Sequence, residues 1–158
     1  MTDSRVGIGF DSHPRDPGRP LRLGGVGFPD EPGLSGHSDG DVVCHALADA
    51  LLGASALGDI GRHFPEGNPG LADIAGLELL RRTIELVKAS GFLPERCDLT
   101  VIAERPHLDD RRDEVRASLA QALGVRIGEV SVKATRPEGL GLTGDGIGCM
   151  ALVTIRPG

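Results

Sequence analysis

The chain has 158 residues, 25% of them charged, and a formal net charge of −6. This length suffices for one domain with a sizeable core, and we expect a single domain over residues 1–158. An acidic balance without a basic stripe argues against a nucleic-acid partner. No apolar run is long enough to span a bilayer, and the N-terminus leads into a strand-like segment rather than a signal peptide. We therefore expect a cytoplasmic protein without a membrane partner.

The first predicted element is a strand over residues 5–10, where apolar side chains alternate with glycines. Such alternation is typical of a strand with one buried face. The opposite face would carry Asp11 and His13, which lie two residues apart and can therefore converge on one ion. The following residues 14–36 are rich in glycine and proline and predict a loop or a small hairpin. The apolar side chains of the strand, which would share one face, are Val6, Ile8 and Phe10.

A helix is expected from about residue 41 to residue 57, in a stretch rich in alanine and leucine. Ser38 and Asp41 have the spacing of a capping box at its start, although Asp stands where Glu or Gln is usual. Asp41, His45 and Asp49 follow at intervals of four residues. They form one polar stripe on an otherwise apolar helix.

The rest of the chain alternates between helices and strands after an aperiodic loop at residues 62–70. Helices are expected where apolar residues recur every three to four positions and a glycine follows. This arrangement predicts an α/β (α+β) two-layer sandwich, with a mixed sheet of about four strands and helices on one face. The expected helices span residues 71–90 and 109–123, and the expected strands span residues 98–103, 130–135 and 147–155.

The cysteines and the core composition complete the expectations about the fold. The chain has three scattered cysteines without a CxxC pair, and we expect all three to be reduced, buried thiols. Aromatic residues make up only 3% of the chain. The core must therefore be filled by leucine, valine, isoleucine and alanine.

Two polar clusters near the N-terminus hold the most informative residues. Asp11 and His13 come from the first strand and His45 from the start of the helix, so two elements can bring three ligands to one point. Catalytic zinc sites use three nitrogen or carboxylate ligands and keep one position open. The pattern therefore predicts an open zinc site. The alternative is a cluster of hydrogen-bonded polar groups at the helix N-terminus.

Other polar groups have ordinary structural explanations beside the functional ones. Asp41 is a natural N-cap, and residues 59–61 can be only a turn that ends the helix. His37 and Ser38 precede a helix N-terminus, which attracts phosphate, and could touch an anionic ligand. Glu138 follows a strand beside glycines and is either solvated or a hard oxygen ligand for Mg²⁺. The chain has no Walker A motif, no GxGxxG motif and no serine nucleophile elbow.

Five strings in the chain resemble a known enzyme family. They are GIGFDSH, LRLGGV, GHSDGDVVCHALADALLGASALGDIG with the RHFP that follows it, DLTVIAERP and VSVKAT. In this order, and over nearly the whole chain, they resemble the 2-C-methyl-D-erythritol 2,4-cyclodiphosphate synthases of the non-mevalonate isoprenoid pathway. The stretch from His37 to Pro65 is the longest and most specific of these matches.

The resemblance implies a homotrimer with an active site at each subunit interface. It implies one Zn²⁺ per chain, bound by Asp11, His13 and His45, and Mg²⁺ or Mn²⁺ bound by Glu138. The substrate would be 4-diphosphocytidyl-2-C-methyl-D-erythritol 2-phosphate, whose 2-phosphate attacks the β-phosphorus and releases CMP. The enzyme would be a phosphorus–oxygen lyase that needs no protein nucleophile, because the substrate supplies its own.

The resemblance also implies which residues contact the substrate. His37, Arg136 and Glu138 would be catalytic, with His37 steadying the attacking phosphate. Other residues would hold the erythritol hydroxyls, form a mobile flap over them and frame the cytidine. The implied contacts are Asp11, Ser12, His13, His37 and Ser38 near the zinc; Asp59, Ile60 and Gly61 at the erythritol; Phe64, Pro65, Glu66, Gly67 and Asn68 in the flap; Ala103, Pro106, His107, Leu108, Asp109, Ala134 and Thr135 around the cytidine; and Arg136, Glu138 and Leu142.

Two departures from the family pattern bear on these roles. The threonine often counted as a transition-state stabiliser falls at Arg136, and an arginine can also stabilise phosphate charge. In the family, a segment with an arginine lines a cavity on the trimer axis. In this chain the corresponding segment is shortened to residues 144–148 and has no arginine. Leu142 stands where the family usually has an aromatic residue. Because arginine makes the strong bonds to diphosphate, we expect isoprenoid diphosphates to bind weakly there. The alternative functions are a non-enzymatic metal-binding trimer and a hydrolase that uses the same two cations.

Overall fold

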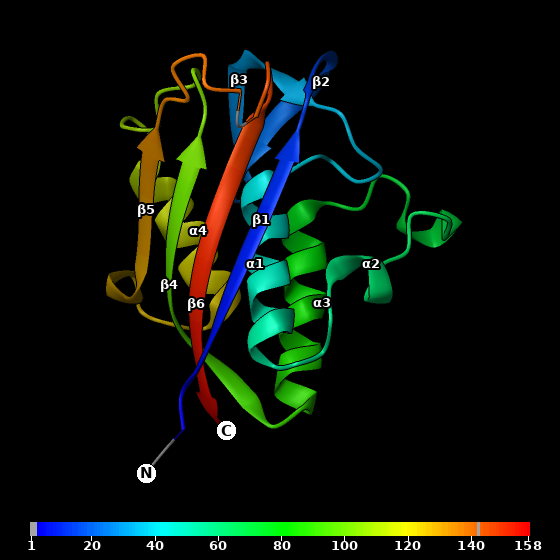
Figure 1. Cartoon of the computed structure of the whole chain (residues 1–158), viewed down its shortest axis with the longest axis vertical. Coiled ribbons are helices and arrows are strands. Elements are labelled where there is room, and N and C mark those ends of the chain that lie inside the picture. The colour runs from blue at the N-terminus through cyan, green and yellow to red at the C-terminus, as the bar shows by residue number, and fades with distance from the viewer. Residues whose placement is uncertain (1–2, 142) are drawn as a thin grey trace.

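The structure is a computed structural model that describes residues 3–141 and 143–158. Its centre is a four-stranded sheet in the order β1-β6-β4-β5 (Figure 1). Strand β6 runs antiparallel to both β1 and β4, whereas β4 and β5 are parallel, so the sheet is mixed as predicted. The strands are β1 (Arg5–His13), β4 (Phe92–Ile102), β5 (Val130–Thr135) and β6 (Ile147–Pro157).

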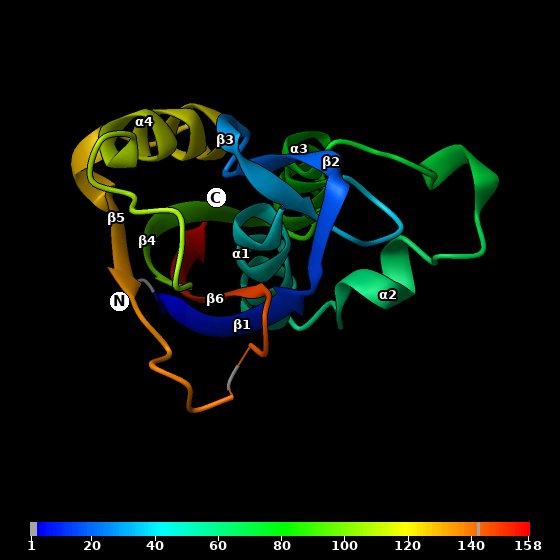
Figure 2. The ribbon, with the colours of Figure 1, turned by 90° about the horizontal axis from the view of Figure 1, so that it is seen from above.

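Three long helices cover one face of this sheet, and one hydrophobic core fills the space between the two layers (Figure 2). The core is almost entirely aliphatic, as the composition predicted. The two-layer α/β arrangement is therefore confirmed. The helices are α1 (Val42–Ala54), α3 (Gly76–Ala89) and α4 (Arg112–Leu123), joined by the short α2 (Ile60–His63), η1 (Pro69–Leu71) and η2 (Ile127–Glu129).

Strand β1 packs directly on α1 because its inward positions are glycines. A Cβ placed on Gly7 would lie 2.0 Å from the carbonyl oxygen of Ala50, and one on Gly9 would lie 2.0 Å from that of Ala46. The helix backbone thus occupies the space that side chains would need. The predicted alternation is confirmed, and the buried face is the glycine face. The apolar side chains on the opposite face are largely exposed, at 62% for Val6, 65% for Ile8 and 48% for Phe10.

The start of α1 differs from the expected capping box. Asp41 is the N-cap, and its carboxylate accepts hydrogen bonds from the backbone N–H groups of Cys44, Gly24 and Gly25, at 3.1, 2.9 and 2.7 Å. The structural explanation of Asp41 is therefore confirmed, while the cap expected at Ser38 is wrong. The two glycines form the turn of a hairpin, so the same carboxylate fixes the helix start to that hairpin.

Several element boundaries also differ from the sequence prediction. The region 14–36 is a full hairpin of β2 (Arg15–Leu23) and β3 (Val26–Leu34). The stretch 62–70, expected to be a loop, contains the end of α2 and most of η1, and α3 begins five residues later than predicted. Strand β4 begins at Phe92, six residues earlier than predicted, because it extends along β6 past an irregular pairing near Pro94.

Two expectations drawn from composition can be compared with the structure. Cys44, Cys97 and Cys149 are all buried and free. Burial raises the pKa of the Cys97 thiol to about 12, so this thiol is unreactive while it stays buried. Within residues 3–141 and 143–158, no helix is long and apolar enough to cross a membrane.

Candidate functional site

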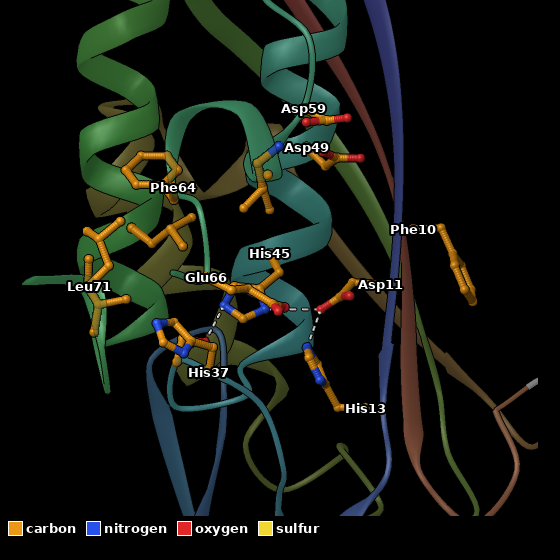
Figure 3. A pocket seen from close by; sticks show the side chains of 15 residues that line it. Phe10, Asp11, His13, His37, His45, Asp49, Asp59, Phe64, Glu66 and Leu71 are labelled. Atoms are coloured by element: carbon orange, nitrogen blue, oxygen red, sulfur yellow. Dashed lines mark hydrogen bonds and ion pairs between the residues drawn. The ribbon is translucent and has the colours of Figure 1, made fainter. Parts of the chain in front are cut away.

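The three predicted metal ligands lie together where the end of β1 meets the start of α1. The Oδ2 atom of Asp11 lies 2.9 Å from His13 Nε2 and 3.0 Å from His45 Nδ1 (Figure 3). One ligand atom from each residue lies within 4.8 Å of the other two. One carboxylate and two imidazoles form the donor set of an open zinc site. Because Asp41 caps the helix, this triad is not needed as a cap cluster.

The local fold explains why these three residues meet. The glycine face of β1 brings the strand against the helix, and Asp11 and His13 follow on that same face. His45 lies in the first turn of α1 and is only 7% exposed. Asp11 and His13 are partly exposed, so the triad is open to solvent on one side. A small molecule could therefore reach a cation bound there.

The ionised carboxylate of Asp11 suits a cation. Burial alone would raise the pKa of Asp11, but hydrogen bonds and charge interactions with His13 and His45 outweigh it and hold this pKa well below its usual range. Burial alone would lower the pKa of His45, and the hydrogen bond and charge of Asp11 raise it instead. The carboxylate is thus ionised at neutral pH, which is the form that binds metal.

Two further residues hold the triad and its neighbouring loop. The Ser38 hydroxyl lies 2.9 Å from His45 Nε2, so both ring nitrogens of this histidine have partners. Such a second contact fixes the orientation of a metal-binding imidazole. Arg19 of β2 donates to the carbonyl oxygens of Gly36 and Ser38, at 2.8 and 2.5 Å, on either side of His37. Sequence reasoning missed Arg19, because a single arginine in a hairpin belongs to no motif.

A cavity of about 280 Å³ opens beside the triad (Figure 3). Asp49 also lines it and accepts a hydrogen bond from the Ile60 backbone N–H at 3.1 Å. Asp49 lies on the same polar stripe of the helix as His45, and this spacing could have predicted that it lies near the triad. Of the predicted contacts, Asp11, His13, His37, Ser38, Asp59, Ile60, Gly61, Phe64 and Glu66 line the cavity, while Ser12, Pro65, Gly67 and Asn68 do not. Phe10, Leu71, Ile74 and Leu79 complete the lining.

A second cavity, of about 160 Å³, lies where β4 and β5 end. Arg136 lines it, and a guanidinium nitrogen lies 3.3 Å from Nε2 and 3.4 Å from Nδ1 of His107. Arg112 was not predicted; it lines this cavity too and donates to Asp109 at 2.7 Å. All the residues expected around the cytidine line this cavity, and they are Ala103, Pro106, His107, Leu108, Asp109, Ala134 and Thr135.

Within one chain the two cavities lie at opposite edges of the sheet. The triad is at β1, which is one edge strand, and the second cavity is at β5, which is the opposite edge strand. Glu138 follows β5 and lines neither cavity. Leu142, the last predicted contact, lies outside the described residues. A single chain therefore does not assemble all the predicted contacts into one site.

Comparison with known proteins identifies the family of this chain. The model of the YgbB family matches residues 4–156. The chain belongs to this family. A protein of Salinibacter ruber named 2-C-methyl-D-erythritol 2,4-cyclodiphosphate synthase is 49% identical over 154 residues, which are 96% of this chain and 98% of that protein. The resemblance found in the sequence motifs is thus confirmed, and the family members so named are enzymes.

Solved structures of relatives have the same fold. The bifunctional IspDF of Campylobacter jejuni matches with a TM-score of 0.94 at 35% identity, over 100% of this chain and 43% of that one. A 2C-methyl-D-erythritol-2,4-cyclodiphosphate synthase in its CDP-bound form matches with a TM-score of 0.88 at 35% identity, over 96% of this chain and 99% of that one. That relative, with the same fold, was therefore solved with CDP bound.

Proposed function

We propose that this protein is a 2-C-methyl-D-erythritol 2,4-cyclodiphosphate synthase, a CMP-releasing lyase of the non-mevalonate isoprenoid pathway. The observation that carries the proposal is the open triad of Asp11, His13 and His45 beside a cavity, in a chain of this family. The substrate is 4-diphosphocytidyl-2-C-methyl-D-erythritol 2-phosphate. The three buried thiols fit a reducing, cytoplasmic setting.

The reaction needs little covalent chemistry from the protein. An oxygen of the 2-phosphate forms a new bond to the β-phosphorus, and the bond from that phosphorus to the bridging oxygen breaks, with its electron pair leaving on CMP. A Zn²⁺ held by the triad would polarise a phosphate oxygen. His37 at the cavity rim steadies the attacking phosphate, and Asp59 accepts hydrogen bonds from the erythritol hydroxyls. Holding the two phosphates in line contributes roughly 7 kcal/mol or more in well-oriented systems.

The phosphates also need positive charge at the leaving group. Glu138 is the proposed protein ligand of Mg²⁺ or Mn²⁺, because a carboxylate suits these hard cations. Arg136 lines the second cavity and is an exposed residue. We assign it the charge-stabilising role that a threonine has in the family pattern, since a guanidinium binds phosphate oxygens directly.

We also propose that the working form is a homotrimer. The face of the sheet opposite the helices has neighbouring exposed apolar pairs, in which Ile8 lies across from Leu152 and Phe10 across from Met150. A contiguous apolar patch of this kind is typical of an interaction surface. A second copy that brings its β5 edge beside the β1 edge of the first would join the two cavities into one site. Three such contacts close a ring.

Product analysis tests the proposed function. The purified protein is incubated with the substrate, Zn²⁺ and Mg²⁺, and phosphorus NMR follows the products. We expect the cyclic diphosphate and CMP in equal amounts. A hydrolase would instead release an open-chain phosphate, and a metal-binding protein without catalytic activity would leave the substrate unchanged.

A further inference from the structure

The segment after β5 holds Glu138 in an unusual backbone conformation. Glu138 has a φ of +51°, in the left-handed region, and Gly139 follows with a φ of +76°. Glycine adopts this region freely, whereas a glutamate there is disfavoured unless its surroundings hold it. The segment between β5 and β6 also projects on the side of the sheet that carries no long helix (Figure 2). A contact with another part of the chain is therefore needed to hold the Glu138 backbone in this conformation.

A carboxylate from the loop that follows β4 makes a contact with this residue. The backbone N–H of Glu138 donates to Oε1 of Glu104 at 2.8 Å. Glu104 can reach it because β4 and β5 continue side by side past their ends, with the Ala103 N–H bonded to the Thr135 carbonyl oxygen at 3.1 Å. A hydrogen bond to an ionised acceptor is stronger than one between neutral groups.

Glu104 is itself fixed by its neighbour in the chain. Arg105 donates through Nε to Oε1 of Glu31 on β3 at 3.0 Å, and its Nη2 lies 2.9 Å from the same oxygen. The Arg15 guanidinium of β2 donates to the carbonyl oxygen of Arg105. The side chain of Glu31 is only 10% exposed, so this ion pair is shielded from solvent on one side. The loop that carries Glu104 is thus tied to the hairpin on one side and to the Glu138 turn on the other.

We propose that Glu104 is a positioning residue for the second cation. Its carboxylate oxygen holds the Glu138 backbone N–H, and thereby keeps the Glu138 side chain where it can bind Mg²⁺ or Mn²⁺. This inference rests on the proposed role of Glu138. The contact needs an acceptor oxygen rather than a charge, so a glutamine at position 104 keeps it and an alanine does not.

The test uses Mn²⁺ as the probe on the full-length, zinc-loaded protein. The variants are Glu104→Ala, Glu104→Gln and Glu138→Gln, with Glu85→Ala on the exposed side of α3 as a matched control. Electron paramagnetic resonance measures Mn²⁺ binding in the presence of CDP, and turnover is measured against Mn²⁺ concentration. We expect Glu104→Ala to raise the Mn²⁺ concentration for half-saturation roughly tenfold, the scale of one lost hydrogen bond to a charged group. Glu104→Gln keeps an acceptor oxygen without the charge and should lose less, roughly threefold, whereas Glu85→Ala should stay within about twofold of the parent.

The outcomes separate the inference from the proposed function. Unchanged Mn²⁺ binding in Glu104→Ala overturns the inference. Equal losses in Glu104→Gln and Glu104→Ala overturn it as well, because they make the charge of Glu104 a direct ligand. Loss of zinc or of the oligomer in Glu104→Ala with normal Mn²⁺ affinity shows a purely structural role. If Glu138→Gln leaves Mn²⁺ binding intact, the proposed role of Glu138 fails whatever the Glu104 variants do.

Discussion

Replacing Gly9 by alanine should damage both stability and the metal site. The new Cβ would lie 2.0 Å from the Ala46 carbonyl oxygen and 2.7 Å from the Ala50 backbone nitrogen. Carbon atoms in good contact are about 3.5 Å or more from their neighbours, so β1 would have to move away from α1 by more than about 1 Å. Overpacking a core typically lowers the free energy of unfolding by about 1–3 kcal/mol. Because the new Cβ clashes with two backbone atoms, we expect a loss of about 3 kcal/mol for this variant.

The assay is thermal unfolding at fixed protein concentration, with zinc content measured on the same samples. For a chain of this length 1 kcal/mol corresponds to about 2–4 °C, so Gly9→Ala should lower Tm by roughly 6–12 °C. Asp11 lies two residues further along the strand and would move away from His45, so zinc content should fall too. The control is Gly27→Ala, where a Cβ meets nothing within 4 Å, and its Tm should stay within about 2 °C of the parent. If Gly9→Ala matches that control and keeps its zinc, β1 does not approach α1 as described.

Three other predictions concern the metal, the assembly and the trimer axis. His45→Ala and Asp11→Ala should each lose zinc, measured by atomic absorption, and turnover, while circular dichroism remains that of the parent; full zinc in both would refute the site. Leu152→Asp should place a charge in the exposed apolar face and yield monomers without activity in light scattering and turnover assays, because the proposed site is shared by two copies. An active monomer would contradict the shared site. Geranyl or farnesyl diphosphate should bind weakly by calorimetry, because the segment 144–148 expected at the trimer axis has Asp145 and no arginine. Tight binding on the axis would show that another cation has replaced the missing arginine.

Local patterns predicted much of the fold. The strand 130–135 was predicted with its observed bounds, because Val130 and Val132 alternate with polar residues and Pro137 follows shortly after. The helix 109–123 ends where expected, since Gly124 takes a left-handed conformation after it. The triad was predicted because a strand Asp-x-His and a histidine in the first turn of a helix are both local signals. Neighbouring residues alone determined the strand and the helix end, whereas the triad also needed the packing of β1 on α1 to bring its two local signals together.

What the sequence could not predict depends on contacts between distant segments. Which face of β1 is buried depends on α1 coming close enough to exclude side chains at Gly7 and Gly9. The contact of Glu104 with Glu138 joins residues 34 positions apart, and no local pattern in the sequence links the two. The distance between the two cavities follows from the order of the strands in the sheet, which alternation within each strand does not encode.

The position of the two cavities at opposite edges of the sheet means that two inactive variants should restore one another's activity when mixed. His45→Ala damages only the β1 edge of a subunit, and Glu138→Gln only the end of β5. In the proposed homotrimer, unfolding the two inactive variants together and refolding them gives mixed trimers, in which some interfaces pair an intact β1 edge with an intact β5 edge. Random mixing of equal amounts makes this pairing in about a quarter of the sites of a closed ring. The mixture of the two inactive variants should thus reach about a quarter of the parental activity. Neither variant should regain activity when it is refolded alone.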